Sequence, residues 1–244
     1  MKIGYSQFEH LKNQSFLKHA IFDKNFGNID YRFGDKKQIF ENRKKIAQEL
    51  GITPKNIYEM EQAHGSEIKV ISDKGKENII KNTDGIITNK KNVFLMVKTA
   101  DCFPVVLYDP IQKVIAAVHV GWRGAIEKIF LLALLKMIDV FDSKSKDVLA
   151  GIGPGLQTCC FKHKSLLQSK LPEWRKYIKK DKNKMFTLDL QNFIKNQLLE
   201  AGIKKENLET MNICTACSKD LFSHIRSLKT GEQEGRFATI VGLK

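Results

Sequence analysis

The sequence predicts an α+β fold with a mixed sheet, and three observations lead to that prediction. The chain has 244 residues, of which 42% are hydrophobic and 28% charged, an ordinary globular composition that can bury a substantial core. Segments with strand-like and helix-like patterns alternate along it. The strand-like segments 105–108 and 114–120 flank the turn signal Asp109–Pro110, which predicts an antiparallel hairpin. Hairpins among alternating elements favour α+β over a doubly wound α/β fold.

The elements of the first half follow from hydrophobic spacing and from turn residues. Apolar side chains at helical spacing begin near Lys36 and end at Gly51, which closes the helix. Extended segments follow, and turn residues such as Asp84–Gly85 separate them. The predicted elements here are a helix at 36–50, extended structure over 57–71 and strands at 86–88, 93–97, 105–108 and 114–120.

In the second half, glycines mark the ends of the predicted elements. Gly121 and Gly124 break the preceding strand, and the apolar positions that follow wrap most of the way around a helix, so we expect that helix to be well buried. A later strand enters the glycine-rich loop 151–155, and Gly202 closes the next helix. The predicted elements are helices at 125–141 and 188–201 and strands at 148–152, 209–214 and 237–241.

The chain is basic, with a net charge of +14 from 41 basic and 27 acidic residues. Lysines dominate and are scattered through helix-like stretches, so we expect solvated faces and no nucleic-acid partner. Arginine is the better phosphate or carboxylate ligand because its planar fork donates two parallel hydrogen bonds. Arg43, Arg226 and Arg236 are therefore candidate anion contacts, with surface or structural ion pairs as the alternative for each.

Cysteine usage and apolar runs bear on where the protein acts. Five cysteines in a chain without a recognisable signal peptide indicate reduced thiols in the cytoplasm. The longest near-continuous apolar run, 129–135, is too short to span a membrane, so we expect no membrane partner. Cys214 and Cys217 are spaced like a redox or zinc pair, but no second ligand pair stands at a suitable spacing, so we expect no function for them.

Three short motifs in the middle of the chain supply one thiol and two imidazoles. They are Gln62–Gly65, Thr99–Pro104 and Ala117–Gly124, which carry His64, Cys102 and His119. Zinc prefers such ligands, and three of them leave a fourth position open for water or substrate. The intervals of 38 and 17 residues are nevertheless unlike those of structural zinc motifs. On spacing alone, a buried cysteine and two hydrogen-bonded core histidines remain the alternative.

Together with other motifs, these runs resemble the YfiH/laccase-domain family, also called the DUF152 or "polyphenol oxidase" family. The matching motifs are Gln62–Gly65, Asp84–Thr88, Thr99–Val105, Ala116–Gly124, Gly151–Phe161, Cys214–Thr215, Phe222–Arg226 and Gly235–Arg236. The resemblance implies a single domain over residues 1–244, with two intimate subdomains as a variant. It implies a layered α/β/β/α sandwich with mixed sheets, related to the fold of a bacterial toxin deamidase.

The resemblance also implies an activity and a metal. The implied metal is zinc, with copper as the other candidate, held by His64, Cys102 and His119. The implied reaction is phosphorolysis of adenosine, inosine or methylthioadenosine to free base and ribose 1-phosphate, accompanied by adenosine deamination. The expected partners are then a purine nucleoside and phosphate, and we expect a monomer or a weak homodimer. An older assignment within the family is copper-dependent oxidation of phenols.

Individual roles follow for the residues that match the motifs. We expect Cys102 and His119 to be catalytic as well as metal-binding. Asp101 precedes the thiol and is a candidate acceptor that orients a ligating histidine, with capping of its turn as the alternative. His224 joins the three candidate arginines as a candidate substrate contact.

The sequence departs from the family pattern in three places. The N-terminal loop is compressed to 26–31, which leaves its substrate contacts open. Lys162 stands where the family usually has a glutamate, and His224 and Arg226 stand where it has paired arginines. The resemblance therefore does not assign an acid/base role to Lys162. It supports only one of the two anion contacts at 224–226.

Three other functions compete with a nucleoside phosphorylase. One is a Cys-His hydrolase or deamidase, with Cys102 as nucleophile and His119 as base. Another is a copper phenol oxidase, which we rank lower because one three-ligand site cannot supply several coppers and the chain has no His-x-His pair. The last is a non-catalytic binding module that uses the basic surface, which salt-dependent retention on nucleic acid would reveal.

Overall fold

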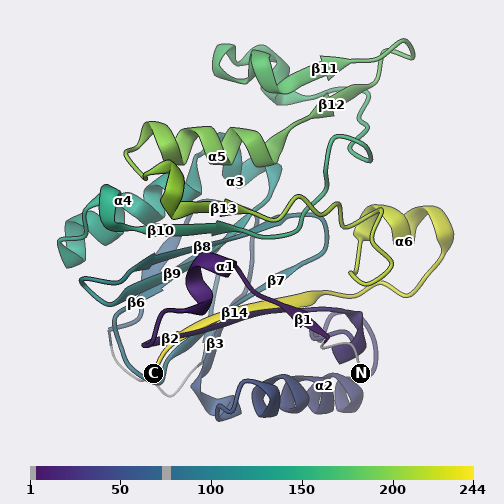
Figure 1. Ribbon diagram of the computed structural model, residues 1–244. Coiled ribbons are helices and arrows are strands. Elements are labelled where there is room, and N and C mark those ends of the chain that lie inside the picture. The colour runs from purple at the N-terminus through teal and green to yellow at the C-terminus, as the bar shows by residue number, and fades with distance from the viewer. Residues whose placement is uncertain (1–3, 73–77) are drawn as a thin grey trace.

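The computed structural model of the chain describes residues 4–72 and 78–244 and layers two mixed sheets between helices (Figure 1). Within these residues each large sheet has six strands, in the orders β1-β2-β14-β7-β3-β5 and β13-β10-β8-β9-β6-β4. The first sheet comprises β1 (Tyr5–Ser6), β2 (Leu17–Phe22), β3 (Ile57–Met60), β5 (Ile79–Ile80), β7 (Phe94–Thr99) and β14 (Phe237–Leu243). The second comprises β4 (Ile68–Val70), β6 (Gly85–Thr88), β8 (Phe103–Asp109), β9 (Val114–Val120), β10 (Leu149–Ile152) and β13 (Leu208–Thr210).

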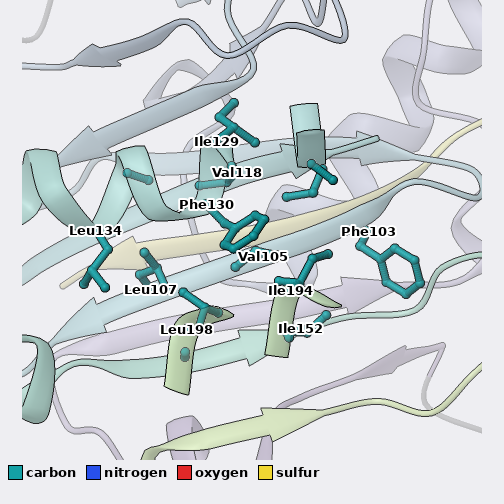
Figure 2. Packing of buried hydrophobic residues seen from close by; sticks show 14 of the residues in the cluster. Phe103, Val105, Leu107, Val118, Ile129, Phe130, Leu134, Ile152, Ile194 and Leu198 are labelled. Carbon is teal, nitrogen blue, oxygen red and sulfur yellow. The ribbon is translucent and has the colours of Figure 1, made fainter. Parts of the chain in front are cut away.

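Helices cover the outer faces of both sheets. The first sheet packs against α2 (Lys36–Glu49), which buries Ile46 in a cluster with strand side chains. The second sheet packs against α4 (Ile129–Phe141) and α5 (Leu190–Glu200), and Figure 2 shows Phe130 of α4 among its side chains. A third cluster, which includes Leu95 and Val106, fills the space between the sheets. This order of layers confirms the predicted α/β/β/α sandwich (Figure 1).

The smaller elements lie at the edges of this sandwich. They are the helices α1 (Glu9–Lys12), α3 (Trp122–Ile126) and α6 (His224–Thr230), the strand pair β11 (Ile178–Lys180) and β12 (Phe186–Leu188), and 3₁₀ turns at Lys24–Phe26, Pro54–Asn56, Ser145–Asp147, Leu167–Lys170, Pro172–Tyr177 and Lys205–Asn207. The sequence patterns predicted none of these elements apart from the end of α3, which falls in the predicted helix 125–141. Across 4–72 and 78–244, no helix has the length and apolar character needed to cross a membrane.

Polar side chains set where the main helices begin. The carboxylate of Asp35 accepts the backbone N–H of Gln38 at 2.8 Å and caps α2. Asp189 caps α5 in the same way, accepting the N–H of Asn192 at 3.1 Å, and Ser223 caps α6. Such caps satisfy N–H groups that have no partner inside the helix. The predicted helices 36–50 and 188–201 are confirmed with ends shifted by one or two residues.

The prediction of one helix over 125–141 is wrong, because the segment forms α3 and α4. Lys128 stands between them in the left-handed conformation, with φ of 55°. Its carbonyl oxygen accepts the N–H groups of Leu131 and Leu132 and so begins the second helix in a new direction. A lysine in that conformation carries no sequence signal comparable to a glycine, so periodicity alone could not locate the break.

The extended segment predicted at 57–71 contains two strands that belong to different sheets, and this arrangement positions the functional site. It consists of β3 in the first sheet and β4 in the second, so the chain crosses between the sheets in 61–67. The chain passes between the same two sheets again in 100–102, from β7 to β8. The predicted hairpin of β8 and β9 is confirmed, with Pro104 opposite His119.

Candidate functional site

Two of the passages between the sheets, at 61–67 and 100–102, each carry one candidate metal ligand. His64 lies in the first crossing and Cys102 in the second. His119 lies near the end of β9, and the register of the hairpin sets it beside Cys102. The ligand atoms of these three residues all lie within 4.8 Å of one another. The fold therefore brings together the three residues that the sequence singled out.

The donor set and its surroundings fit a metal ion with an open side. The imidazole rings of His64 and His119 have centroids 4.7 Å apart and planes at 85°, so they meet edge to face and do not stack. His119 is buried, Cys102 is half-buried and His64 is exposed. One thiol and two imidazoles suit zinc or copper, and exposure on one side leaves room for a further ligand.

Asp84 fixes two of the three candidate ligands. Its Oδ1 lies 2.7 Å from Nδ1 of His119 and accepts the backbone N–H of His64 at 3.0 Å. Its Oδ2 accepts the backbone N–H groups of Ala63 at 3.1 Å and Gly65 at 2.8 Å. A carboxylate on Nδ1 keeps a proton there and leaves Nε2 of His119 as the coordinating nitrogen.

The histidine acceptor is Asp84, whereas the sequence suggested Asp101 for this role. The two carboxylate oxygens of Asp101 accept the hydroxyl of Thr215 at 2.6 Å and the backbone N–H of Ile225 at 2.7 Å. Asp101 has a positive φ of 90°, and these bonds hold the turn that presents Cys102. Asp101 therefore caps its own turn, which is the alternative role that the sequence analysis gave it. In the sequence, Asp84 stood out only as part of a turn signal.

Burial and mutual contact set the ionisation of Cys102 and His119. Burial favours the neutral thiol, but the charge of His119 and its hydrogen bond outweigh burial and lower the pKa of Cys102 to about 6. Burial also opposes a charge on His119, yet Cys102 and Asp84 raise the pKa of this imidazole to about 9. These directions favour a thiolate and an imidazolium at neutral pH, and a metal bound by His119 would displace the proton from Nε2. Thiolate is the form of cysteine that binds metals.

Gly121 leaves the space in which the ligands converge. A Cβ atom at this position would lie 3.2 Å from both Sγ of Cys102 and Cδ2 of His64. These distances are shorter than an ordinary van der Waals contact between carbon and sulfur or carbon and carbon. A side chain here would press on two candidate ligands at once.

A cavity of about 500 Å³ opens beside the three ligands. Leu156, Phe161 and Leu190 give it an apolar wall. Its cationic lining residues are Arg32, Lys98, Arg123 and Arg236. A second cavity, of about 760 Å³, adjoins it and shares Arg32, Gln62 and Lys98. A cavity of this size, with a few polar groups on an apolar wall, suits a small organic ligand.

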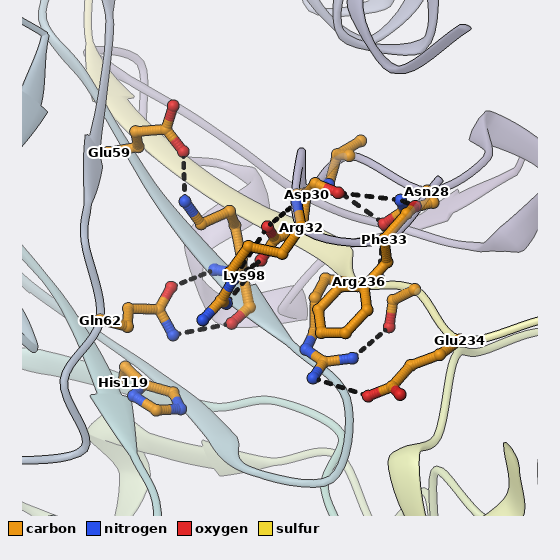
Figure 3. A network of polar contacts seen from close by, with 12 residues as sticks. Asn28, Asp30, Arg32, Phe33, Glu59, Gln62, Lys98, His119, Glu234 and Arg236 are labelled. Atoms are coloured by element: carbon orange, nitrogen blue, oxygen red, sulfur yellow. Dashed lines mark hydrogen bonds and ion pairs between the residues drawn. The ribbon is translucent and has the colours of Figure 1, made fainter. Parts of the chain in front are cut away.

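Gln62 ties the first crossing to the first sheet. Its side-chain amide donates to the carbonyl oxygen of Lys98 at 2.8 Å and accepts the N–H of Lys98 at 2.9 Å. Figure 3 shows this pair near His119, and the ammonium group of Lys98 forms an ion pair with the buried Glu59. The backbone ahead of His64 is thus fixed to β7 by a paired amide contact.

Two of the predicted anion contacts are engaged in structural bonds. Arg43 forms a bidentate pair with Glu59, at 2.7 and 3.0 Å. Arg226 pairs with Glu232 at 2.6 Å and donates its other N–H groups to backbone carbonyl oxygens within 215–221. In the described part of the chain, neither guanidinium lines the cavity beside the candidate ligands.

The other two predicted substrate contacts, Arg236 and His224, line the cavity and share one carboxylate. Glu234 lies 3.0 Å from Nη2 of Arg236 and 2.7 Å from Nδ1 of His224. Figure 3 shows the Arg236 guanidinium and its bond to Glu234. Each side chain still has donor atoms that this carboxylate does not use.

Arg123 is a cavity residue that the sequence analysis did not select. Its guanidinium lies over the Trp122 ring, 4.4 Å from the centroid. Among the described residues it has no carboxylate or hydrogen-bond partner for its side chain, which sets it apart from the other arginines of the cavity. The sequence feature that could have singled out Arg123 is its position inside the motif Gly121–Gly124.

The departures from the family motifs lie at the edge of the site or outside it. Lys162 pairs with Asp181 at 3.1 Å and is not a lining residue of the described cavity. The compressed N-terminal loop still brings Tyr31 to the adjoining cavity, and Arg32, directly after it, lines both cavities.

Comparison with known sequences gives consistent matches over almost the whole chain. The family model described as multi-copper polyphenol oxidoreductase laccase matches residues 18–244. A purine nucleoside phosphorylase of Clostridium acetobutylicum is 34% identical over 242 residues, 98% of this chain and 96% of that protein. The purine nucleoside phosphorylase YlmD of Bacillus subtilis is 28% identical over 218 residues, 84% of this chain and 77% of that protein.

Solved structures match the fold. The Bacillus licheniformis hypothetical protein YfiH has a TM-score of 0.86 and 26% identity, covering 99% of this chain and 100% of that chain. YlmD from Geobacillus stearothermophilus has a TM-score of 0.88 and 21% identity, covering 99% of both chains.

Proposed function

The chain belongs to the laccase-domain family, and we propose that it is a zinc-dependent purine nucleoside phosphorylase that also deaminates adenosine. Relatives named purine nucleoside phosphorylase support an enzyme whose substrates are a nucleoside and phosphate. The observation that carries the proposal is the convergence of His64, Cys102 and His119 beside a cavity of about 500 Å³ that also presents guanidinium groups. Adenosine, inosine and methylthioadenosine are the proposed nucleosides.

The proposed metal site depends on how the chain prepares its ligands. Zinc held by His64, Cys102 and His119 would supply Lewis acidity at one wall of the cavity. Asp84 orients His119 through Nδ1 and fixes the backbone of His64. The thiol of Cys102 has a lowered pKa, so it offers a thiolate at neutral pH.

For phosphorolysis, the chain has to bring phosphate to the sugar. The glycosidic bond breaks, the departing base takes up a proton, and a phosphate oxygen bonds to the anomeric carbon. The sugar is positively charged in the transition state, so a nearby phosphate stabilises it. We assign phosphate binding to Arg123 and Arg236, because both line the cavity and a guanidinium matches two phosphate oxygens. Phe161 and Leu156 supply apolar surface for the purine.

Product analysis tests the proposal directly. The purified chain, with its metal content measured, is incubated with adenosine in the presence and absence of phosphate, and the products are separated. Adenine that forms only with phosphate supports phosphorolysis, and inosine that forms without phosphate supports deamination. If a folded, zinc-loaded sample forms neither adenine nor inosine, the proposal is contradicted. His64→Ala is the matched variant and is expected to abolish turnover, whereas Thr158→Ala, an exposed position outside the described cavity, is expected to retain it.

A Cys-His hydrolase is the second candidate, and a specific contact favours it. The carboxylate of Asp84 orients His119, which neighbours the Cys102 thiolate, as in a nucleophile, base and orienting acid. The metal content separates the two candidates, because a thiolate that ligates zinc is a poor nucleophile. Full hydrolase activity in metal-free protein, lost on alkylation of Cys102, would favour the hydrolase. Copper reconstitution with a phenol substrate tests the oxidase that the family description names.

A further inference from the structure

Four of the five cysteines gather at one point outside the cavity lining described above. They are Cys159, Cys160, Cys214 and Cys217, and their sulfur atoms all lie within 4.8 Å of one another. The sulfur of Cys217 is 3.4 Å from that of Cys160 and 3.7 Å from that of Cys159. The expectation that the pair Cys214 and Cys217 lacks a second ligand pair is therefore wrong. The second pair comes from a loop more than fifty residues earlier in the chain.

We propose that these four cysteines form a second metal site, a structural zinc site with four thiolate ligands. Structural zinc is tetrahedral with Zn–S bonds of about 2.3 Å, which places neighbouring sulfurs about 3.8 Å apart. The sulfur separations found here are close to that edge length. The remaining cysteine, Cys102, belongs to the candidate catalytic group, so each cysteine of the chain has a place in one of two metal sites.

The turn that carries Cys214 is shaped to hold a thiolate. Backbone N–H groups of Ala216 and Cys217, and of Gln157 on the other loop, face the sulfur of Cys214. The carbonyl oxygen of Cys214 accepts the N–H of Ser218 at 3.0 Å and closes the turn. Backbone N–H groups directed at a sulfur stabilise its negative charge and orient it, as the outer partners of metal ligands do.

The two loops are held together by the backbone, independently of any ion. Gly155 donates its N–H to the carbonyl oxygen of Ile213 at 3.2 Å, and its own carbonyl oxygen accepts the N–H of Thr215 at 3.1 Å. Arg226 then donates to the carbonyl oxygens of Thr215 and Ser218, both at 2.6 Å. These bonds fix the backbone beside each cysteine pair, so the geometry of the sulfur cluster is preorganised.

The same two loops meet at Asp101, next to Cys102. Leu156 on the first loop donates its N–H to the carbonyl oxygen of Asp101 at 2.7 Å. Thr215 on the second loop donates its hydroxyl to the Asp101 carboxylate at 2.6 Å. A zinc ion between the loops would therefore brace the turn that presents Cys102. The proposed site is structural, and it stands whether or not the chain is a nucleoside phosphorylase.

Metal stoichiometry tests the proposal. Protein purified under reducing conditions with zinc is expected to carry about two zinc ions per chain. Cys217→Ser and Cys214→Ser are expected to lower this to about one, and His64→Ala is expected to lower it to about one by removing the other ion. Thr158→Ala, next to Cys159 but without a sulfur, is expected to keep both. The proposal would be overturned if Cys217→Ser and Cys214→Ser each carried as much zinc as the unmutated chain.

Measurements on the unmutated chain cover the case in which a cysteine variant does not fold. Cobalt in place of zinc is expected to show thiolate-to-cobalt charge-transfer absorption typical of several thiolates, and His64→Ala is expected to retain most of it. Alkylation followed by peptide mass analysis is expected to find Cys159, Cys160, Cys214 and Cys217 protected by zinc and reactive after chelation. Full alkylation in the presence of zinc, or a disulfide among these cysteines under reducing conditions, would show that the cluster is not a zinc site.

Discussion

Oδ1 of Asp84 lies 2.7 Å from Nδ1 of His119, while the same carboxylate accepts three backbone N–H groups of the segment that carries His64. One side chain thus orients two candidate ligands that come from different parts of the chain. We expect Asp84→Asn to weaken zinc binding about 10- to 100-fold, because an amide cannot accept from all of these donors. Competition with a chromophoric chelator measures the affinity.

Asp101→Asn is the matched control for this prediction. Asp101 is adjacent to Cys102 but accepts from Thr215 and Ile225, not from a candidate ligand. We expect this variant to bind zinc more tightly than Asp84→Asn does. Equal losses of affinity in the two variants would contradict the role given to Asp84.

A methyl group at position 121 is expected to disturb the candidate metal site without disturbing the fold. Its Cβ would lie 3.2 Å from atoms of both Cys102 and His64, so Gly121→Ala should lower zinc affinity. Gly65→Ala is the control at the same site, since its Cβ would meet only Asp84, at an ordinary 3.8 Å, and Gly65 has no positive φ. Zinc titration and far-UV circular dichroism of both variants check this, and a zinc affinity unchanged in Gly121→Ala would refute it.

Arg123 is expected to contribute to phosphate binding. Its guanidinium lines the cavity with no carboxylate partner among the described residues, so it is available to an anion. We expect Arg123→Ala to raise the KM for phosphate about 10- to 100-fold, the equivalent of losing one hydrogen bond to a charged group. The KM for the nucleoside should change much less. Arg175→Ala, an exposed arginine that does not line the cavity, serves as the control and should leave both constants unchanged.

Arg43 is expected to act on stability and not on phosphate. It forms a bidentate pair with Glu59, whose side chain is only 7% exposed. Arg43→Ala leaves Glu59 with Lys98 as its remaining cationic partner, so we expect the free energy of unfolding to fall by about 2 kcal/mol, the contribution of a hydrogen bond to a charged group. Urea unfolding measures the loss. A raised KM for phosphate in a variant of unchanged stability would reverse this assignment.

His19 is expected to make the protein less stable in mild acid. Burial lowers its pKa from 6.5 to about 4, and its Nε2 accepts the backbone N–H of Phe8 at 2.9 Å, which requires the neutral ring. Between these two pKa values the unfolded chain binds a proton that the folded chain does not, so stability is complete above pH 6.5 and falls as the pH drops toward 4. The loss attributable to this group approaches about 3 kcal/mol at pH 4, from 1.36 kcal/mol per pKa unit.

Urea unfolding at a series of pH values checks the His19 prediction. His19→Gln should be less stable at neutral pH but should show a shallower decline toward pH 4 than the unmutated chain. His163→Gln is the control, since this exposed ring shows no comparable burial, and it should keep the original decline. Parallel declines in the unmutated chain and in His19→Gln would disprove the role of this histidine.

Much of the fold and of the candidate ligand group could be predicted from the sequence, because both rest on local patterns. The runs at 105–108 and 114–120 and the turn between them specify a hairpin, and the hairpin register determines that His119 lies beside Cys102. The order of the layers followed from motifs that resemble a family, and the structure confirms it.

The rest depends on contacts between segments that are distant in sequence. Asp84 became an orienting residue only because the crossing at 61–67 folds over it. The guanidinium of Arg43 is not free to bind phosphate because it forms an ion pair with the buried carboxylate of Glu59. Cys159 and Cys214 come together because the backbone at Gly155 joins two loops. Spacing along the chain carries no information on any of these contacts.

The placement of His64 and Cys102 at passages between the sheets makes assembly of the candidate metal site depend on assembly of both sheets. Among the described strands, β14 comes last in the sequence and lies in the interior of the first sheet, between β2 and β7. The first sheet is therefore continuous only after residues 237–243 have joined it, and the segments that carry His64 and Cys102 reach their final positions late in folding.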